Sequence, residues 1–305
     1  MYNAFFTKFI RRIALKGTVL YEVRDNVAVL TVDNPPVNPL SDGVRTGLYE
    51  SITKAESDDS VKGVVVTGNG RAFIAGADIS EFGGNVEGVS LNEVFSKLEF
   101  CSKPVVAAIN GIALGGGLET ALCCNYRIAA NTAFVGLPEV NLGLLPGGGG
   151  TQRLPRLAGP SEALKMMLTG GHVPAKKALS MGIIDDISDN VVEDSIKFVL
   201  DKAENSENHP KVRDLNEKMI EARGNDKILL EAQAMAAKSR KGQFAPGQII
   251  KCVEAAINLD DFDAGLKKEG ELFLECLLHP QREAMIHIFF GERAASKISD
   301  VPKET

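Results

Sequence analysis

Three consecutive glycines, Gly115 to Gly117, stand just ahead of a carboxylate, Glu119. At the start of a helix, backbone N–H groups lack partners, and residues without a Cβ atom let a ligand approach them closely. The aligned peptide dipoles also favour negative charge at that end of the helix. The pattern indicates a site for an oxyanion in the first turn, next to Glu119. The alternative is close packing of a helix on a sheet, with Glu119 placed favourably for the helix dipole.

A second glycine-rich stretch contains another carboxylate, Glu139, within residues 136–153 (GLPEVNLGLLPGGGGTQR). It must lie on a different element from Glu119, so only the fold could bring the two together. Two carboxylates in one site can share the roles of acid and base if their surroundings hold them in different protonation states. The alternative for Glu139 is an ordinary solvated loop residue.

A third stretch, residues 70–82 (GRAFIAGADISEF), follows an apolar segment and is rich in small residues. Ala75, Gly76 and Ala77 would let another backbone N–H group face a ligand. The alternative is a plain strand-to-helix turn capped by Asp78.

Composition and motifs exclude several classes of function. The glycines match neither the Walker A loop nor the GxGxxG dinucleotide fingerprint. With 34 basic and 40 acidic residues, the formal net charge is −6, and no general field attracts nucleic acid. The five cysteines form no CxxC pair, so we expect no metal site and no disulfide framework, but buried thiols in a reducing compartment. No apolar run reaches the roughly 18–20 residues that span a bilayer, so we expect no membrane span.

The segments between these motifs predict an α/β protein. Residues 18–24 and 26–32 are β-branched runs on either side of Asp25, which is typical of a hairpin. Residues 42–57 have the apolar spacing of an amphipathic helix. Residues 61–68 and 104–112 are continuous apolar runs of the kind found in buried parallel strands. Their alternation with helical patterns predicts a largely parallel sheet.

Three regions are expected along the chain. Residues 1–17 form a basic leader, either a targeting segment or a disordered or helical lead-in to the first strand. Residues 18–190 form the α/β core. Residues 191–305 form a helical C-terminal region that packs on the core, because no long Gly/Ser linker separates them.

The ordered set of motifs resembles the crotonase (enoyl-CoA hydratase/isomerase) superfamily, and most of all the N-terminal hydratase portion of multifunctional β-oxidation enzymes. The residues that carry the resemblance are NPPVNPLS (34–41), RAFIAGADI (71–79), PVVAAINGIALGGGLETAL (104–122) and VGLPEVNLGLLPGGGGTQRLPRLAG (135–159). The fold that this implies is a crotonase-like spiral of ββα repeats followed by a C-terminal helical region.

The resemblance also implies the site. The two catalytic glutamates of the family fall on Glu119 and Glu139, and its oxyanion hole, two backbone N–H groups, falls on Ala77 and Gly116. Further contacts to the substrate and its coenzyme A portion are implied at Ala75, Gly76, Asp78, Ile79, Gly115, Leu144, Pro146 and Gly147. Two departures from the family pattern stand close to these residues: Gly148, where alanine is common and where glycine should loosen the loop, and Thr120, which adds a hydroxyl near the helix start.

The implied function is hydration of 2-trans-enoyl-CoA to 3-hydroxyacyl-CoA in fatty acid β-oxidation, by a lyase that needs no metal or redox cofactor, since coenzyme A is part of the substrate. The alternatives are Δ3-Δ2-enoyl-CoA isomerisation and a catalytically idle acyl-CoA-binding subunit. We expect an acyl-CoA thioester and no nucleic acid as partner. The helical tail favours a monomer or dimer, whereas single-function relatives suggest a trimer. We expect an intracellular protein; the mitochondrial matrix, the peroxisome and the bacterial cytoplasm stay open.

Overall fold

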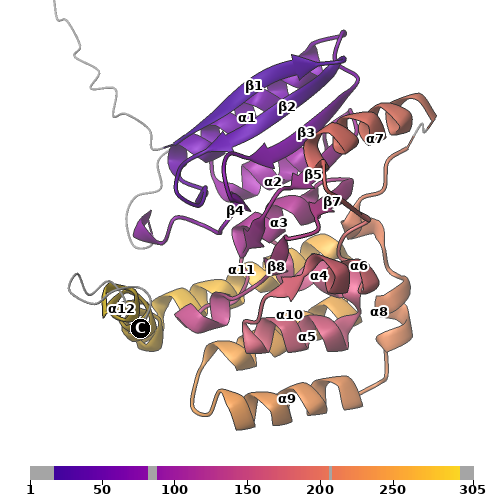
Figure 1. The fold of residues 1–305 in the computed structure, drawn as a ribbon. Helices are drawn as coiled ribbons and strands as arrows, with labels where there is room; N and C mark the ends of the chain where they lie inside the picture. Colours follow the sequence, from indigo (N-terminus) through magenta and orange to yellow (C-terminus); the bar gives the residue numbers. More distant parts are fainter. Residues whose placement is uncertain (1–16, 82–87, 206–207, 296–305) are drawn as a thin grey trace, which may run out of the picture.

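The computed structural model describes residues 17–81, 88–205 and 208–295. Residues 1–16 of the predicted leader and residues 82–87, which include Gly83 and Gly84, lie outside these ranges. Figure 1 shows an upper layer built on a twisted sheet and a lower layer of helices that holds most of the C-terminal half of the chain.

The main sheet has six strands in the order β1-β2-β3-β5-β7-β10. They are β1 (Thr18–Arg24), β2 (Val27–Asp33), β3 (Gly63–Gly68), β5 (Val105–Ile109), β7 (Tyr126–Ala130) and β10 (Asp186–Ser188). Only the β1–β2 pair is antiparallel; the other neighbours pair in parallel. The predicted hairpin and the largely parallel sheet are therefore confirmed.

A second, smaller sheet explains how the chain forms a spiral. Its strands are β4 (Ala72–Ile74), β6 (Ile112–Leu114), β8 (Phe134–Gly136) and β9 (Val173–Pro174), in that order. Three times in succession the chain makes a strand of the large sheet, a strand of the small sheet and then a helix. The first helices are α1 (Asp42–Ser57), α2 (Leu91–Glu99), α3 (Gly116–Cys123) and α4 (Gly150–Ala158). The ββα repeat implied by the resemblance is confirmed.

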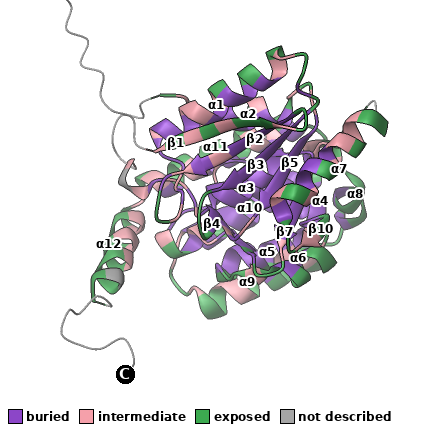
Figure 2. Cartoon of the chain, turned by 45° about the horizontal axis from the view of Figure 1, so that its top comes forward, coloured by how far each residue is buried: buried purple, intermediate pink, exposed green. Residues whose placement is uncertain are grey.

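Alternation along the central strands separates two apolar faces. In β3, Val64 and Val66 belong to the large core cluster that includes residues of α1 and α3, whereas Val65 packs with Ile196 and Val199 of α7 (Val191–Asn205). Both faces of the sheet are thus covered, as continuous apolar strands require. In Figure 2 the central strands β3 and β5 are buried, whereas the edge strand β1 and the outer helices carry exposed residues.

Every element after β10 that the structure describes is helical. These are α7, α8 (Glu217–Ala222), α9 (Lys227–Ser239), α10 (Ala245–Asn258), α11 (Phe262–Leu278) and α12 (Pro280–Ala295), with a short 3-10 turn, η3 (Val212–Asp214). The remaining helical elements are α5 (Pro160–Thr169), α6 (Ala175–Ser180), η1 (Ile79–Glu81) and η2 (Glu139–Leu142). Leu272 and Cys276 of α11 belong to the same core cluster as the strands. The expected change at residue 190 is a change of secondary structure within one hydrophobic core, and the division into domains stays a prediction.

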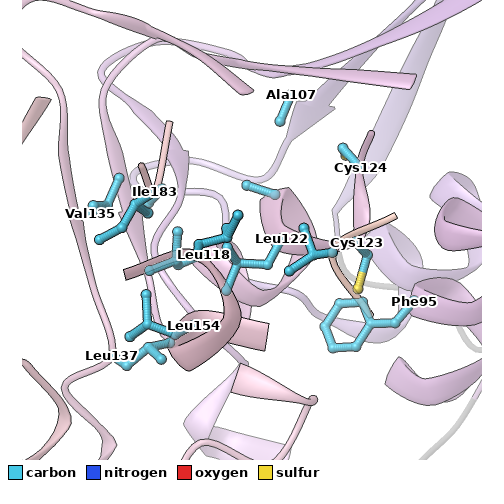
Figure 3. Packing of buried hydrophobic residues seen from close by; sticks show 14 of the residues in the cluster. Phe95, Ala107, Leu118, Leu122, Cys123, Cys124, Val135, Leu137, Leu154 and Ile183 are labelled. Carbon is cyan, nitrogen blue, oxygen red and sulfur yellow. The ribbon is translucent and has the colours of Figure 1, made fainter. Parts of the chain in front are cut away.

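Helix α3 passes through the middle of this core. All of its residues are buried, and Figure 3 shows Leu118 and Leu122 among side chains from other elements, including Val135 and Leu154. The helix begins against strand β4 so closely that a Cβ atom on Gly117 would lie 1.9 Å from the carbonyl oxygen of Ile74. The interpretation of these glycines as residues for close packing is thus supported at Gly117, and their role in binding an oxyanion stays a prediction.

Candidate active site

Glu119 lies in the first turn of α3 and is buried. Its Oε1 accepts hydrogen bonds from the backbone N–H groups of Gly148 (2.7 Å) and Gly150 (2.8 Å). Burial raises the pKa of Glu119, while these two hydrogen bonds and the charge of Arg153 act to lower it. Two donors aimed at one oxygen stabilise the ionised carboxylate.

Glu139 is the first residue of η2, and its side chain lies close to Gly115, the residue just before α3. A Cβ atom on Gly115 would lie 3.0 Å from its Oε1. Its Oε2 is shielded from solvent and has no hydrogen-bond partner among the described residues. Burial, followed by the negative charges of Glu119 and Glu269, raises the pKa of Glu139 well above its usual value. Glu139 is therefore not the solvated loop residue of the alternative interpretation.

Two backbone N–H groups lie side by side near these carboxylates. Gly116 is the first residue of α3, so its N–H has no partner in the helix. A Cβ atom on Gly116 would lie 3.4 Å from the backbone nitrogen of Ala77. A bridge to Leu40 fixes the Ala77 backbone, and the N–H of Leu40 donates to the oxygen of Gly76 (2.9 Å). Their positions suit two donors that converge on one oxygen, as an oxyanion hole requires.

The residue directly before each of these donors must be glycine because of its backbone conformation. Gly76 has φ +114° and Gly115 has φ +53°, which L side chains rarely adopt. The positive φ angles thus occur at the residues directly before the two candidate donors, Ala77 and Gly116.

The other residues predicted to contact the substrate differ in burial and in whether their N–H groups are already hydrogen-bonded. The N–H groups of Ala75 and Gly115 are already bonded, to the oxygens of Val37 (3.0 Å) and Gly136 (2.8 Å), so neither is a free donor. The remaining predicted residues are Asp78, which is buried; Ile79, in η1; Leu144 and Pro146, which are buried; and Gly147, which is half-buried. Their contacts to coenzyme A stay predictions.

Sequence reasoning missed a further carboxyl group at this site, the buried Glu269 on α11. Its Oε1 accepts from the N–H of Gly149 (2.7 Å), and its Oε2 accepts from the N–H (3.1 Å) and hydroxyl (2.5 Å) of Thr151. Burial and the charge of Glu119 raise the pKa of Glu269 to about 8, against the lowering effect of these donors and of Arg153. The local sequence, LKKEGEL, carries no signal for this role.

The glycine loop is also held through a carbonyl group. Arg153 donates to the oxygen of Gly148 (3.2 Å) and forms a two-point contact with Glu99 of α2 (2.9 and 2.8 Å). Both side chains of this ion pair are almost fully buried. The loop backbone is therefore bonded to charged side chains on α3, α4 and α11, and Glu99 of α2 holds the one from α4, Arg153.

The two departures from the family pattern are explained by local contacts. A Cβ atom on Gly148 would lie 2.3 Å from the ring of Phe95 and 2.7 Å from Oε2 of Glu119. Glycine thus lets the loop pack tightly here, contrary to the expected loosening. The hydroxyl of Thr120 donates to the oxygen of Gly116 (2.7 Å), so it is used within the helix.

Comparison with known proteins agrees with this geometry. The family model described as "Enoyl-CoA hydratase/isomerase" matches residues 22–245. The peroxisomal bifunctional enzyme of Danio rerio is 41% identical over 276 residues, covering 90% of this chain and 38% of the relative. The glyoxysomal fatty acid beta-oxidation multifunctional protein MFP-a of Cucumis sativus is 40% identical over 303 residues, covering 94% of this chain and 41% of the relative. The chain thus spans about two fifths of the length of these relatives.

A solved structure shares the fold. The enoyl-CoA hydratase/isomerase from Pseudoalteromonas atlantica T6c superposes with a TM-score of 0.67 at 24% identity, covering 90% of this chain and 97% of that one. Within the described ranges, no cluster of acidic, histidine or cysteine side chains could hold a metal ion. None of the helices in those ranges has the length and apolar character needed to cross a bilayer.

Proposed function

The chain belongs to the enoyl-CoA hydratase/isomerase family, and from this premise we propose that it hydrates 2-trans-enoyl-CoA to 3-hydroxyacyl-CoA in fatty acid β-oxidation. The observation that carries the proposal is a pair of glutamates in unlike surroundings, Glu119 buried and Glu139 half-buried with one shielded oxygen. Glu119 accepts two backbone hydrogen bonds, whereas Glu139 has an unpartnered, shielded oxygen. One carboxylate is stabilised as the anion and the other as the acid, which is what addition of water requires.

In the proposed reaction, the oxygen of a water molecule bonds to C3 of the enoyl group while Glu119 removes a proton from that water. The π electrons of the C2–C3 double bond shift so that negative charge develops on the thioester oxygen. The N–H groups of Ala77 and Gly116 stabilise that oxygen; losing one such donor typically costs about 3–4 kcal/mol of transition-state stabilisation. The enolate then takes a proton at C2 from Glu139, which completes the addition.

The nearest alternative is Δ3-Δ2-enoyl-CoA isomerisation, which needs only one carboxylate to move a proton along the acyl chain. Glu139, with its free oxygen, could serve alone in that reaction. The two backbone donors held on Glu119 would then have no catalytic purpose. A catalytically idle acyl-CoA binder is a further alternative, but it would keep the buried carboxylate of Glu119 without using it, and burying a charge is costly.

The test is to mix the purified chain with crotonyl-CoA and to follow the loss of enoyl absorbance, with the product identified by mass. Formation of 3-hydroxyacyl-CoA is the expected result. Conversion of a 3-enoyl-CoA to the 2-enoyl isomer without hydration would favour the isomerase. Binding of acyl-CoA without either reaction would favour the idle binder.

The compartment is inferred from the relatives' names alone. Because these include peroxisomal and glyoxysomal enzymes, we infer a peroxisome-like organelle rather than the mitochondrial matrix. Fractionation of cells that express the untagged chain, with markers for both organelles, tests this inference. Light scattering of the purified chain distinguishes a monomer or dimer from a trimer.

A further inference from the structure

We propose that Glu269 is a positioning residue: from the C-terminal helix α11 it fixes the 148–151 backbone that presents hydrogen bonds to Glu119. The inference rests on the proposed function for its effect on catalysis, but its structural part can be tested without activity. It makes the C-terminal helical region part of the active-site machinery.

The N–H groups of four successive residues alternate between two carboxylates. Those of Gly148 and Gly150 donate to Glu119, and those of Gly149 and Thr151 donate to Glu269. A segment with this alternation is clamped from both sides, one clamp on α3 and the other on α11. If the α11 clamp is released, the loop backbone keeps only its hydrogen bonds to Glu119 and Arg153, and the two N–H groups that serve Glu119 are less firmly directed.

The glycines that make this loop possible also make it flexible without the clamp. Glycine loses more conformational freedom on ordering than any other residue, and residues 147–150 are all glycine. Gly149 has φ +89°, and a Cβ atom there would lie 1.9 Å from Nη1 of Arg153. The loop cannot be stiffened by larger side chains at this position, so external hydrogen bonds must order it.

A carboxyl group is the side chain that this position demands. Each of the two oxygens of Glu269 accepts from a backbone N–H group, of Gly149 or of Thr151, and Oε2 also forms a hydrogen bond with the hydroxyl of Thr151, so both ends of the side chain must be oxygen atoms. A glutamine of the same shape would turn its NH₂ group toward one of the N–H donors and lose that contact. The hydroxyl of Thr151 is itself oriented, because it accepts from Nε2 of Gln152 (2.9 Å).

The first test is hydrogen–deuterium exchange of the loop amides in wild type and in Glu269→Gln. We expect exchange at residues 148–151 to be about tenfold or more faster in the variant. The control is Glu271→Gln, an exposed glutamate on the same helix, which should leave exchange unchanged. Equal protection of the loop in wild type and Glu269→Gln overturns the proposal, and this holds even if the wild type hydrates nothing.

The second test is kinetic, on the wild type first and then on the variants. For Glu269→Gln we expect kcat for hydration to fall about 100-fold, with KM within about threefold because acyl-CoA contacts are untouched. The alkaline limb of the pH–kcat profile should move to lower pH, since the ionised Glu269 raises the pKa of Glu139. An unchanged kcat, or a loss seen only in KM, overturns the proposal.

A pair of variants on the other side of the contact covers the case in which Glu269→Gln does not fold. Thr151→Val keeps the shape but removes the hydroxyl donor, and should lower kcat about tenfold. Thr151→Ser keeps the hydroxyl and should retain nearly full kcat. Equal activity in the two variants overturns the proposal. A wild type inactive toward both crotonyl-CoA and 3-enoyl-CoA would sink the proposed function instead, and the exchange result alone then decides the role of Glu269.

Discussion

Glu119 and Glu139 differ in what surrounds their oxygens, and this difference gives them separate chemical tasks. The two donors on Glu119 come from a loop that also closes over its side chain, so its charge is held in a buried place. The unpartnered oxygen of Glu139 is left for a substrate or water. Neither environment could be read from the sequence, because both depend on a loop and helices distant in the chain.

The first prediction concerns these two carboxylates. Glu119→Gln and Glu139→Gln should each lower kcat for hydration by about 10²- to 10⁴-fold, because each loses one partner of the proton transfer. Far-UV circular dichroism should be unchanged, and Glu254→Gln, an exposed glutamate on α10, should keep wild-type kcat. Full hydration by either site variant at normal stability would contradict the assignment. Retained isomerase activity in Glu119→Gln alone would point to Glu139 acting by itself.

The second prediction concerns the pH dependence of stability. The pKa of Glu269 is raised from 4.5 to about 8, so the folded protein holds a proton there that the unfolded chain releases above about pH 4.5. The retained proton adds to the free energy of unfolding; this stabilisation is fully present below pH 4.5 and is lost as pH rises through about 8. It amounts to at most about 5 kcal/mol of unfolding free energy.

Urea unfolding at several pH values checks this. The unfolding free energy of Glu269→Gln should fall less between pH 5 and 8 than that of the wild type, because glutamine does not titrate. The variant also loses a hydrogen bond at every pH, which lowers its stability throughout. The test is therefore the slope of the unfolding free energy against pH, not its value at one pH. Parallel slopes for the two proteins would show that Glu269 titrates normally in the fold.

At the scale of elements, the start of α3 depends on how closely a helix can approach a strand. Gly117→Ala would put a Cβ atom 1.9 Å from the oxygen of Ile74, an atom of the backbone that cannot move aside. We expect the variant to be destabilised by about 3 kcal/mol. Gly270→Ala on α11 is the matched control: its Cβ would meet nothing within 4 Å, so this exposed helix position should gain up to about 1 kcal/mol. Urea unfolding of both variants measures the difference, and equal stability would contradict the packing argument.

The elements that the sequence predicted are those with a clear pattern of apolar residues, either at helical spacing or as a continuous run. Residues 42–57 carry apolar side chains at helical spacing, and α1 spans those residues. The continuous apolar run around Val64 to Val66 predicted a strand buried on both faces, and β3 is one. The strands of the small sheet are two or three residues long, too short for any period to be visible, so the ββα repeat came from the motif resemblance alone.

At the candidate site, too, the sequence predicted only the residues that stand in a recognisable local pattern. The glycine turns and the two glutamates stand in recognisable local patterns, and the structure brings Glu119 close enough to Glu139 for its negative charge to raise the pKa of Glu139. Glu269 has no such pattern, because its role arises only when α11 packs against the loop before α4. A contact between such distant segments is set by tertiary packing, which a single sequence does not encode in its local periodicity.

At the scale of the whole molecule, a series of ion pairs, buried at Glu99 and Arg153 and exposed at Asp263, joins the α/β repeats to the helical region. Glu99 of α2 binds Arg153 of α4 and also Arg213 of η3, which in turn binds Asp263 of α11. The hydrophobic core likewise runs from the strands to α10 and α11 without a break. Unfolding one part would expose the buried surface and charges of the other.

We therefore expect the chain to unfold in a single cooperative transition, although its length would permit two. Glu99→Gln leaves the guanidinium of Arg153 buried without its anion, and breaking such a pair costs about 3–5 kcal/mol; the variant should shift the whole transition to lower temperature without splitting it. Glu231→Gln, which removes an exposed pair with Lys227, should leave the transition in place. Scanning calorimetry decides: equal calorimetric and van't Hoff enthalpies in wild type and Glu99→Gln support one cooperative unit. A separate low-temperature peak would mean that the helical region melts alone and that its hold on the glycine loop is lost before the sheet unfolds.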